Sequence, residues 1–374
     1  MILASIQASA LAIPFKVAFK HASAERVTTQ SIWVEIRTTA GALGHGEGCP
    51  REYVTAEDLT SAQSFIARHN DEWLRTICDL GTLISWASLH RDDIDVHPAA
   101  WTAVELALLD LLAKEQGCSV EALLDVPELT ENFRYTAVLG DSPTRQFEAL
   151  LAHYLQDGFS EFKIKLSGER ERDLAKVSAL NAAGIAPLSV RADANNLWSD
   201  AKTAIQHLES LDYPFWALEE PLHAGSLDGM QQIAKSLAAK IILDESLLRI
   251  AQLDPLANTP GHWVINLRIS KMGGLLRSLE FAKEARERGL GMIVGAHVGE
   301  TSLLTRAALT IAQSARDILI AQEGAFGTHL LAYDLAEPAL MFGDGGILNA
   351  ANIAAKPGFG LTLSYAPNRQ ESPP

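Results

Sequence analysis

The sequence predicts an α/β protein whose larger part is a barrel of alternating strands and helices and whose first part is an α+β segment. After about residue 130, short apolar strands alternate with helical stretches, giving eight strand-like segments. Seven of these segments end in a polar residue, and these residues recur every 24 to 29 positions, about the length of one βα unit. They are Lys165, Asp193, Glu219, Asp244, Arg268, His297 and Glu323. A doubly wound open sheet is the alternative, but no GxGxxG follows the first strand, so the barrel is preferred.

The segment before residue 125 has a different order of patterns. Its first 20 residues predict a strand rather than a signal peptide, because no basic stretch precedes the apolar one. Residues 31–50, SIWVEIRTTAGALGHGEGCP, predict two strands joined by a glycine-containing turn. Helical patterns begin near Ala56, and the strongly apolar stretch 99–118 predicts a helix that ends near Gly117.

Composition narrows the class of protein. The chain has 374 residues, of which 48% are hydrophobic and 21% charged, a normal globular balance. A formal charge of −15 with no basic run argues against nucleic-acid or anionic-membrane binding. No apolar run reaches the roughly 18 residues of a membrane span. Three cysteines without a CxxC pair fit a reducing compartment, so we expect a cytoplasmic protein.

Three acidic residues end three successive predicted strands. They are Asp193 in RADAN, Glu219 in ALEEP and Asp244 in ILDES. For any one of them a helix N-cap or a surface loop is the ordinary explanation. Three at matching positions would meet at the barrel mouth, where clustered carboxylates need a cation among them. Such oxygen ligands suit Mg²⁺, with Mn²⁺ as a substitute ion.

The stretch EFKIKLSG places Lys163 and Lys165 on the same face of the strand that precedes the Asp193 strand. Taken alone, this alternation also fits an exposed edge strand. Beside the three acids, two neighbouring ammonium groups should depress each other's pKa and make a neutral amine accessible. A neutral lysine beside a divalent ion can take the proton from the carbon next to a carboxylate, and the ion stabilises the resulting enediolate.

These motifs together resemble the enolase superfamily, and most closely its muconate lactonizing enzyme subgroup. The similar stretches are GHGEGCPREYVTAED, FKIK, RADANNLW, ALEEPL, ILDES, NLRISKMGG and EGAFGTHLL. The resemblance implies an α+β capping domain over residues 1–125 and a modified TIM barrel, (β/α)₇β, over 126–345. It also implies that residues 346–374 return to the capping domain.

The resemblance assigns roles to the residues at the strand ends. It implies Mg²⁺ bound by Asp193, Glu219 and Asp244, Lys165 as the acid/base, and Lys163 as its electrostatic partner. Asn195 is expected near the metal. The second acids of two pairs, Glu220 and Glu245, are expected to support the site rather than to bind the ion.

The sixth strand departs from the family pattern. Two residues after Asn266, where the family usually has a second catalytic lysine, this chain has Arg268. A guanidinium is a poor general base, so we expect Arg268 to supply fixed positive charge or to pair with a metal-site acid. Lys271 is expected to start the next helix. On the seventh strand His297 is either a second base, as in the mandelate racemase subgroup, or a structural or substrate-binding group.

Other expectations concern the substrate. Glu323 resembles the glutamate of the ELFG element, and the DxD that dipeptide epimerases carry near the last strand is replaced by QEGAFG, which argues against a dipeptide. Two capping loops, residues 19–26 and 49–53, are expected to set specificity. Their candidate residues, each of which is otherwise an ordinary surface residue, are His21, Arg26, Arg51 and Tyr53.

Three functions fit these residues. The first, which the sequence favours, is a one-base cycloisomerase or lyase of the muconate lactonizing enzyme type, in which Lys165 does all the proton work. The second is a two-base racemase, epimerase or dehydratase that uses Lys165 and His297. The third is a non-catalytic, metal-stabilised binding protein, which has no need of paired lysines. For either enzyme the expected partner is a small-molecule carboxylate substrate. The sequence is also compatible with a homo-oligomer.

Overall fold

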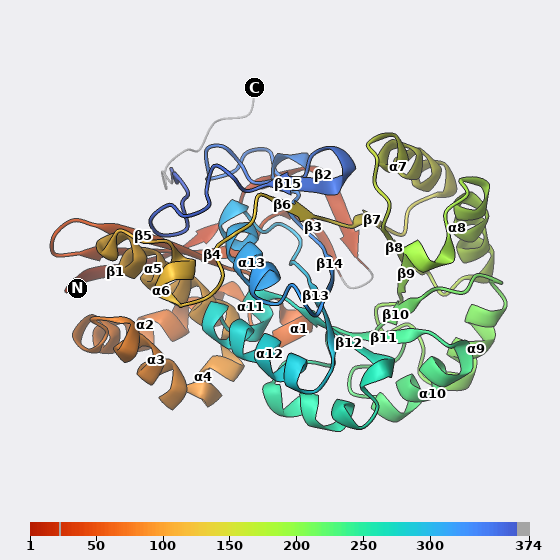
Figure 1. The fold of residues 1–374 in the computed structure, drawn as a ribbon, viewed down its shortest axis with the longest axis horizontal. Helices are drawn as coiled ribbons and strands as arrows, with labels where there is room; N and C mark the ends of the chain where they lie inside the picture. The colour runs from red at the N-terminus through yellow and green to blue at the C-terminus, as the bar shows by residue number, and fades with distance from the viewer. Residues whose placement is uncertain (22–23, 365–374) are drawn as a thin grey trace.

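The structure is a computed structural model that describes residues 1–21 and 24–364 (Figure 1). Its first part begins with five strands, which form two antiparallel sheets. One sheet has the order β1-β4-β5 and the other pairs β2 with β3. The strands are β1 (Leu3–Leu11), β2 (Pro14–His21), β3 (Ala24–Thr28), β4 (Ser31–Thr38) and β5 (Leu43–Gly48). The predicted hairpin over residues 31–50 is confirmed, since every residue of β5 pairs with a residue of β4, from Ile32↔Gly48 to Arg37↔Leu43.

Six helices complete this capping domain: α1 (Glu52–Thr55), α2 (Leu59–Thr76), α3 (Leu80–Leu89), α4 (Arg91–Val96), α5 (Pro98–Gln116) and α6 (Val120–Leu123). The predicted apolar helix is α5, which is buried from Pro98 to Ala113 and ends at Gly117, whose φ is +66°. It lies directly on β5. An added Cβ at Gly44, Gly46 or Gly48 would come within 2.1 Å of a carbonyl oxygen of α5. The glycines of GALGHGEG therefore allow helix and sheet to touch backbone to backbone.

Eight parallel strands form the largest described sheet, in the order β14-β13-β12-β11-β10-β9-β8-β7. They are β7 (Ala137–Leu139), β8 (Phe162–Lys165), β9 (Val190–Asp193), β10 (Ala217–Glu219), β11 (Lys240–Leu243), β12 (Trp263–Leu267), β13 (Gly291–Val294) and β14 (Leu319–Gln322). The amide of Thr136, just before β7, donates to the carbonyl of Gln322 at 2.8 Å, which joins the first strand to the last. All eight predicted strand segments are present, and the barrel prediction is confirmed.

The connections lie outside the strands (Figure 1). The α-helices are α7 (Thr144–Gln156), α8 (Arg170–Ala182), α9 (Ala201–Glu209), α10 (Leu227–Leu237), α11 (Ile269–Met272), α12 (Leu275–Glu287) and α13 (Ser302–Ser314). Between β11 and β12 the chain forms 3₁₀ turns over 250–258 and 260–262 instead of an α-helix. Within the described residues no α-helix follows β14, so the order is the expected (β/α)₇β with 3₁₀ turns in place of the helix between β11 and β12.

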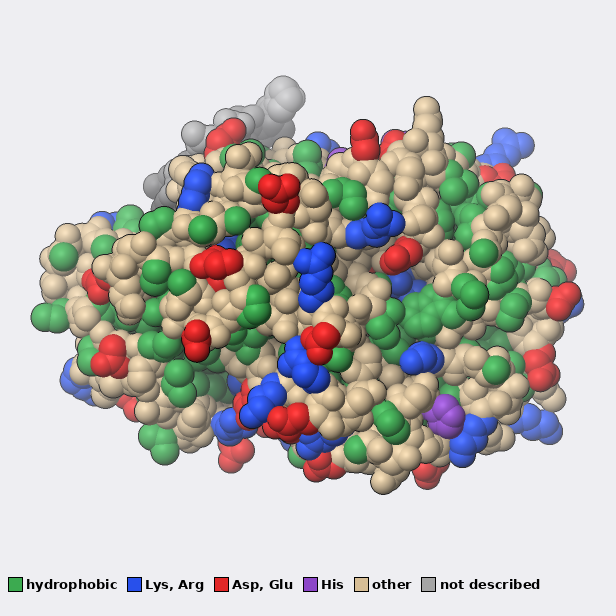
Figure 2. All heavy atoms as spheres, viewed as in Figure 1, with side chains coloured by type: hydrophobic (Ala, Val, Ile, Leu, Met, Phe, Trp, Pro, Cys, Tyr) green, Lys and Arg blue, Asp and Glu red, His purple; other side chains and the backbone are tan. Residues whose placement is uncertain are grey.

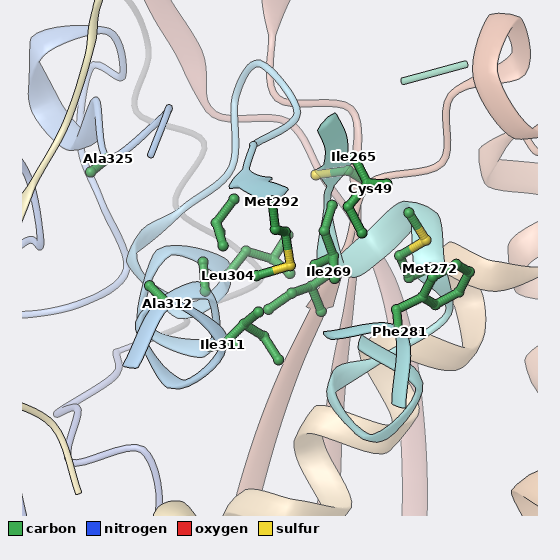
Figure 3. Close-up of a cluster of buried hydrophobic side chains, with 14 of the residues drawn as sticks. Cys49, Ile265, Ile269, Met272, Phe281, Met292, Leu304, Ile311, Ala312 and Ala325 are labelled. Carbon is green, nitrogen blue, oxygen red and sulfur yellow. The ribbon is translucent and has the colours of Figure 1, made fainter. Parts of the chain in front are cut away.

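Buried glutamates of the capping domain cap two barrel helices. Glu47 on β5 accepts hydrogen bonds from the amide and hydroxyl of Thr301, at the start of α13. Glu105 on α5 accepts from the amide of Leu276, at the start of α12. Because helix N-termini carry unpaired N–H groups and partial positive charge, these contacts bind the domains together. Figure 3 shows part of the shared apolar core, in which Cys49 joins side chains of β12, α11 and α13.

The C-terminal segment contacts both a short strand before the barrel strands and the end of the capping domain. Strand β15 (Ile347–Asn349) pairs with β6 (Asn132–Arg134), and the backbone of Gly358 exchanges hydrogen bonds with Cys118 and Val120 at the start of α6. These contacts agree with a tail that returns to the capping domain, while the boundaries at 125 and 345 stay a prediction. On the face seen in Figure 2, basic and acidic side chains are interspersed. No helix in the described ranges combines the length and apolar character that a membrane crossing needs.

The contact between β5 and α5 leads to a stability prediction. In Gly46→Ala the new Cβ would lie 1.7 Å from the carbonyl oxygen of Ala103, and backbone atoms cannot turn aside as a side chain can. We expect the free energy of unfolding to fall by at least about 1–3 kcal/mol, the usual cost of overpacking. Urea denaturation measures it. The control is Gly261→Ala, where nothing lies within 4 Å of the added Cβ. Equal stabilities for the two variants would contradict the close packing.

Candidate active site at the barrel mouth

Strand register brings the predicted acids together. Lys165 pairs with Asp193 between β8 and β9, and Asp193 pairs with Glu219 between β9 and β10. Asp244 directly follows the last residue of β11. All three carboxylates are buried at the carboxyl ends of neighbouring strands. The short apolar strands thus deliver one acid each to the same end of the barrel, as their spacing in the sequence predicts.

Lys163 is the central cation of the cluster. Its Nζ lies 2.7 Å from Glu219 Oε2, 3.2 Å from Asp193 Oδ2 and 3.1 Å from Glu323 Oε2. Burial by itself lowers the pKa of Lys163, but the carboxylates of Asp193, Glu219 and Glu323 outweigh it and raise the pKa above the ordinary lysine value. The expectation that each lysine lowers the pKa of the other is therefore wrong for Lys163. Its three neighbouring carboxylates raise its pKa by more than burial lowers it.

Glu323 links this cation to a second one. Its Oε1 accepts hydrogen bonds from Arg191 Nη2 at 2.6 Å and Nε at 3.2 Å, while Oε2 faces Lys163. Burial opposes ionisation of Glu323, but Lys163 and Arg191 overcome it and bring the pKa to about 2. Glu323 is therefore a charged member of the cluster, and both of its oxygens are engaged.

Lys165 has different surroundings. Its Nζ donates to Asn195 Oδ1 at 2.8 Å and lies 3.7 Å from Asp193 Oδ2. Burial is the main cause that lowers its pKa, helped by Lys163 and Arg268 and opposed by Asp193. For Lys165 the expected direction agrees with the structure. The backbone N–H of Asn195, whose φ is +44°, donates to Asp193 Oδ1 at 3.0 Å. Asn195 therefore orients both Lys165 and Asp193.

Asp244 is held by two cations from the sixth strand and the helix after it. Arg268, half-buried at the end of β12, pairs with Asp244 Oδ2. Lys271 is expected from the sequence to start the next helix, but α11 begins at Ile269, and the Lys271 side chain turns back into the barrel. Its Nζ lies 2.9 Å from Asp244 Oδ1 and donates to the carbonyls of Asp244 and Asn266 at 2.8 and 2.7 Å. Burial, then Arg268, lowers the pKa of Lys271 to about 7.

The second acids of the pairs lie behind the first. Glu220, with φ +38°, accepts from the amides of Asp244 and Ser246 at 2.6 and 2.7 Å and from the Ser246 hydroxyl at 2.8 Å. It therefore positions the backbone that carries Asp244. Glu245 is half-buried, and burial followed by Glu220 raises its pKa to about 7.

His297 lies in the loop after β13 and is buried. Its backbone amide donates to Glu300 Oε1 at 2.6 Å, whereas neither ring nitrogen has a hydrogen-bond partner. Burial, followed by the charges of Arg268 and Arg51, lowers its pKa well below the ordinary histidine value. Its Nδ1 lies 3.6 Å from Glu300 Oε1, and the lowered pKa means that burial and the neighbouring cations disfavour the protonated ring.

The capping-loop residues have separate surroundings. Arg51 is buried, and its guanidinium donates to four carbonyls, those of Thr29, Gln30, Pro50 and Val298. It thereby ties the loop after β5 to the loop after β13. Tyr53 is 36% exposed, and the Arg26 guanidinium lies 5.6 Å from the centre of its ring. The side chain of His21 lies outside the described residues. Substrate contacts by these residues stay a prediction.

The donor set suits a hard divalent cation. Asp193, Glu219 and Asp244 offer only carboxylate oxygens, on three adjacent strands, and Asn195 and Glu220 orient them from behind. Glu219 Oε2 is buried and has no partner of hydrogen-bond geometry, although Lys163 lies beside it. An oxygen in that position is available to a metal ion. Sequence reasoning missed Lys271 and Arg191, because a lysine one turn into a helix and an arginine inside a strand carry no signal of their own.

The fold agrees with that of the known proteins to which the chain is similar. Residues 2–125 match the mandelate racemase / muconate lactonizing enzyme N-terminal domain, and residues 146–366 match the enolase C-terminal domain-like family. The chain belongs to the enolase superfamily, as its motifs predict.

Its curated relatives include epimerases. The L-Lys-D/L-Arg epimerase of Methylococcus capsulatus is 28% identical over 93% of this chain and 94% of its own. The L-Ala-D/L-Glu epimerase of Bacillus subtilis is 27% identical over 95% of each. Among solved structures, the Methylococcus dipeptide epimerase complexed with Mg and the dipeptide L-Arg-D-Lys has a TM-score of 0.82 at 28% identity, over 97% of this chain and 100% of its own. The N-succinyl Arg/Lys racemase of Bacillus cereus, at 23% identity and a TM-score of 0.82, shares the fold over 97% of this chain and 96% of its own.

We predict that Glu219→Gln removes divalent-cation binding at the mouth, because an amide cannot replace the charge and one oxygen donor of the carboxylate. For the unmodified protein, Mg²⁺ at about 100 times its Kd should add roughly 2.7 kcal/mol of stability, and the variant should show none of it. Differential scanning calorimetry with and without Mg²⁺ measures the effect. Glu161→Gln, at the opposite end of β8, is the matched control. A Mg²⁺-dependent rise in Tm that is also seen in Glu219→Gln would contradict the assignment of Glu219 as a metal ligand.

Proposed function

We propose that this protein is a Mg²⁺-dependent epimerase or racemase that inverts the stereocentre next to a carboxylate. The observation that carries the proposal is a pair of buried side chains that can transfer protons. Lys165 ends β8 and His297 follows β13, at the same end of the barrel as Asp193, Glu219 and Asp244. The relatives support the same reaction type, since those named above are epimerases or racemases. They favour the two-base hypothesis over the one-base cycloisomerase or lyase that the sequence favours.

Most of the chemistry belongs to residues of this chain. The ion, held by Asp193, Glu219 and Asp244, would bind the substrate carboxylate and stabilise the negative charge that develops on it. Lys163, kept charged by its carboxylates, adds a fixed positive charge beside the reacting group. Asn195 fixes the amine of Lys165 by its 2.8 Å hydrogen bond, so that the proton is taken or returned at one defined place.

Inversion requires a second group on the other face of the planar intermediate. In the strand order, β13 lies three positions from β8 when counted through β7 and β14, and five when counted the other way. His297 therefore projects from nearly the far side of the mouth relative to Lys165. In one direction His297 takes the α-proton and Lys165 returns one from the opposite face; the reverse direction exchanges their roles. Arg268 contributes charge only, since a guanidinium does not give up its proton.

We infer that the substrate is an amino acid whose α-nitrogen is acylated and whose carboxylate is free. Dipeptides and N-succinyl amino acids, which appear in the names of the relatives, share this group. For a distal ammonium, as in a dipeptide, an acid near the last strand would be useful. Here the only acid of QEGAFG is Glu323, and Lys163 and Arg191 occupy both of its oxygens. An acyl group without a free ammonium therefore fits better.

Solvent-deuterium exchange tests the two bases separately. We expect the unmodified protein to exchange the α-proton of both enantiomers of an N-acyl amino acid in ²H₂O, as followed by NMR. Lys165→Ala should lose exchange with one enantiomer and His297→Asn with the other, because each base serves one face. Overall inversion should fall by about 10²–10⁴-fold in either variant. His153→Asn, a histidine exposed on α7, is the control.

Two outcomes would argue against the proposal. Exchange of both enantiomers at normal rates in His297→Asn would show that His297 is not the second base. Exchange of both enantiomers at normal rates in Lys165→Ala would show that Lys165 transfers no proton. Parallel assays with L-dipeptides and N-succinyl amino acids test the substrate inference, and faster turnover of dipeptides would contradict it.

A further inference from the structure

A second cluster of metal-ligating side chains lies in the capping domain, far along the chain from the strand-end acids. His69 and Glu72 stand one turn apart on α2, and His90 lies between α3 and α4. One ligand atom from each of the three lies within 4.8 Å of the other two. In Figure 1 the helices α2, α3 and α4 lie together, apart from strands β8–β11.

The distances are those of a metal site. His69 Nδ1 lies 3.3 Å from Glu72 Oε2, and His90 Nε2 lies 3.9 Å from Glu72 Oε1. In a tetrahedral site with bonds of about 2.0–2.1 Å, neighbouring ligand atoms are roughly 3.3 Å apart. The three donor atoms lie within 4.8 Å of one another, so an ion bound to all three would draw them closer together, and the half-exposed Glu72 side chain has room to move.

Each histidine has its other ring nitrogen directed to an acceptor. His90 Nδ1 lies 2.9 Å from the carbonyl of Trp86, so this nitrogen carries the proton and Nε2 keeps its lone pair. His69 Nε2 is buried, lacks a hydrogen-bond partner and points to Asp93 Oδ2 at 3.8 Å. His69 Nδ1 donates a hydrogen bond to Glu72 Oε2 at 3.3 Å, so an ion that binds Nδ1 would displace this proton and leave the ring protonated on Nε2. Metal-binding histidines are typically oriented in this way by a carbonyl or a carboxylate.

Aromatic packing holds both rings in place. The His90 ring stacks on Trp86 with centres 4.0 Å apart and planes 10° apart. The His69 ring contacts Phe65, Trp73 and Trp86 with centres 4.9 to 5.6 Å apart. Little side-chain freedom would be lost on binding, because these neighbours already restrict the rings.

We propose that His69, Glu72 and His90 bind a divalent transition-metal ion of the Zn²⁺ class, with Asp93 orienting His69 and solvent completing the coordination. Two imidazoles and one carboxylate suit Zn²⁺, whereas Mg²⁺ prefers oxygen ligands. The site is thus chemically distinct from the all-carboxylate set at the barrel mouth. A bound ion would join α2 to the α3–α4 junction and stabilise the capping domain.

The test is a Zn²⁺ titration of the full chain by calorimetry in the Glu219→Gln background, which removes the mouth carboxylate. We expect one Zn²⁺ per chain. His90→Gln and Glu72→Gln should each weaken binding more than tenfold, since each removes a ligand, and Asp93→Asn should weaken it about 10- to 100-fold through His69. His153→Gln, on α7, should leave binding unchanged. Mg²⁺ in millimolar excess should not compete.

A spectroscopic readout separates a site from a loss of folding. Co²⁺, substituted for Zn²⁺, should give visible absorption typical of four-coordination in the parent protein and lose it in His90→Gln, while His90→Cys, which restores a ligand, should regain it. The proposal is overturned if Zn²⁺ affinity is the same in the parent, His90→Gln and Glu72→Gln. It is equally overturned if the parent binds no Zn²⁺, which would leave the cluster as an ordinary set of histidine–carboxylate contacts.

Discussion

The barrel mouth depends on one buried ammonium group, that of Lys163. A carboxylate without a partner is costly in the interior, and here the carboxylates of Asp193, Glu219 and Glu323 share the same cation within 3.2 Å. These acids come from the ends of β9, β10 and β14, so a single charge couples three strands to β8. Removing it would leave several buried negative charges uncompensated, which is far more costly than the loss of an exposed ion pair.

Lys163 and Lys165 have different roles because they have different neighbours. Lys163 faces the carboxylates and stays charged, whereas Lys165, two residues on, faces the amide oxygen of Asn195 and has only Asp193 nearby at 3.7 Å. Its pKa is therefore lowered while that of its neighbour is raised. One lysine supplies charge and the other can exchange a proton, and the difference arises from neighbours on other strands.

Buried acids also place the capping domain over the barrel. Glu47 and Glu105 cap the starts of α13 and α12, and burial raises their pKa values to about 8 and about 7. A carboxyl whose pKa is raised by folding holds its proton more tightly in the folded state, so its contribution to stability falls as the pH rises from about 4.5 toward those values. Arg51 completes the interface through backbone carbonyls of both domains.

Much of this arrangement could be predicted from sequence because it follows from periodicity. The spacing of polar residues after apolar strands predicts the barrel, the three acids and the place of Lys165. The parts that could not be predicted depend on side chains that cross between elements. Lys271 turns back from a helix to Asp244, and Arg191 reaches Glu323 from within β9. Arg51, expected to set substrate specificity, donates hydrogen bonds to backbone carbonyls such as that of Val298. The pKa of Lys163 was predicted in the wrong direction for the same reason, since its partners come from three other strands.

The central claim is that the strand-end carboxylates form one divalent-cation site around which the proton-transfer groups are arranged. The most direct measurement is a crystal structure of the Mn²⁺-loaded protein with anomalous diffraction at the manganese edge. The account predicts one anomalous peak bonded to oxygens of Asp193, Glu219 and Asp244 at roughly 2.0–2.3 Å, with the Lys163–Glu219 and Arg268–Asp244 contacts lengthened. No peak at the mouth, with both contacts unchanged, would contradict it.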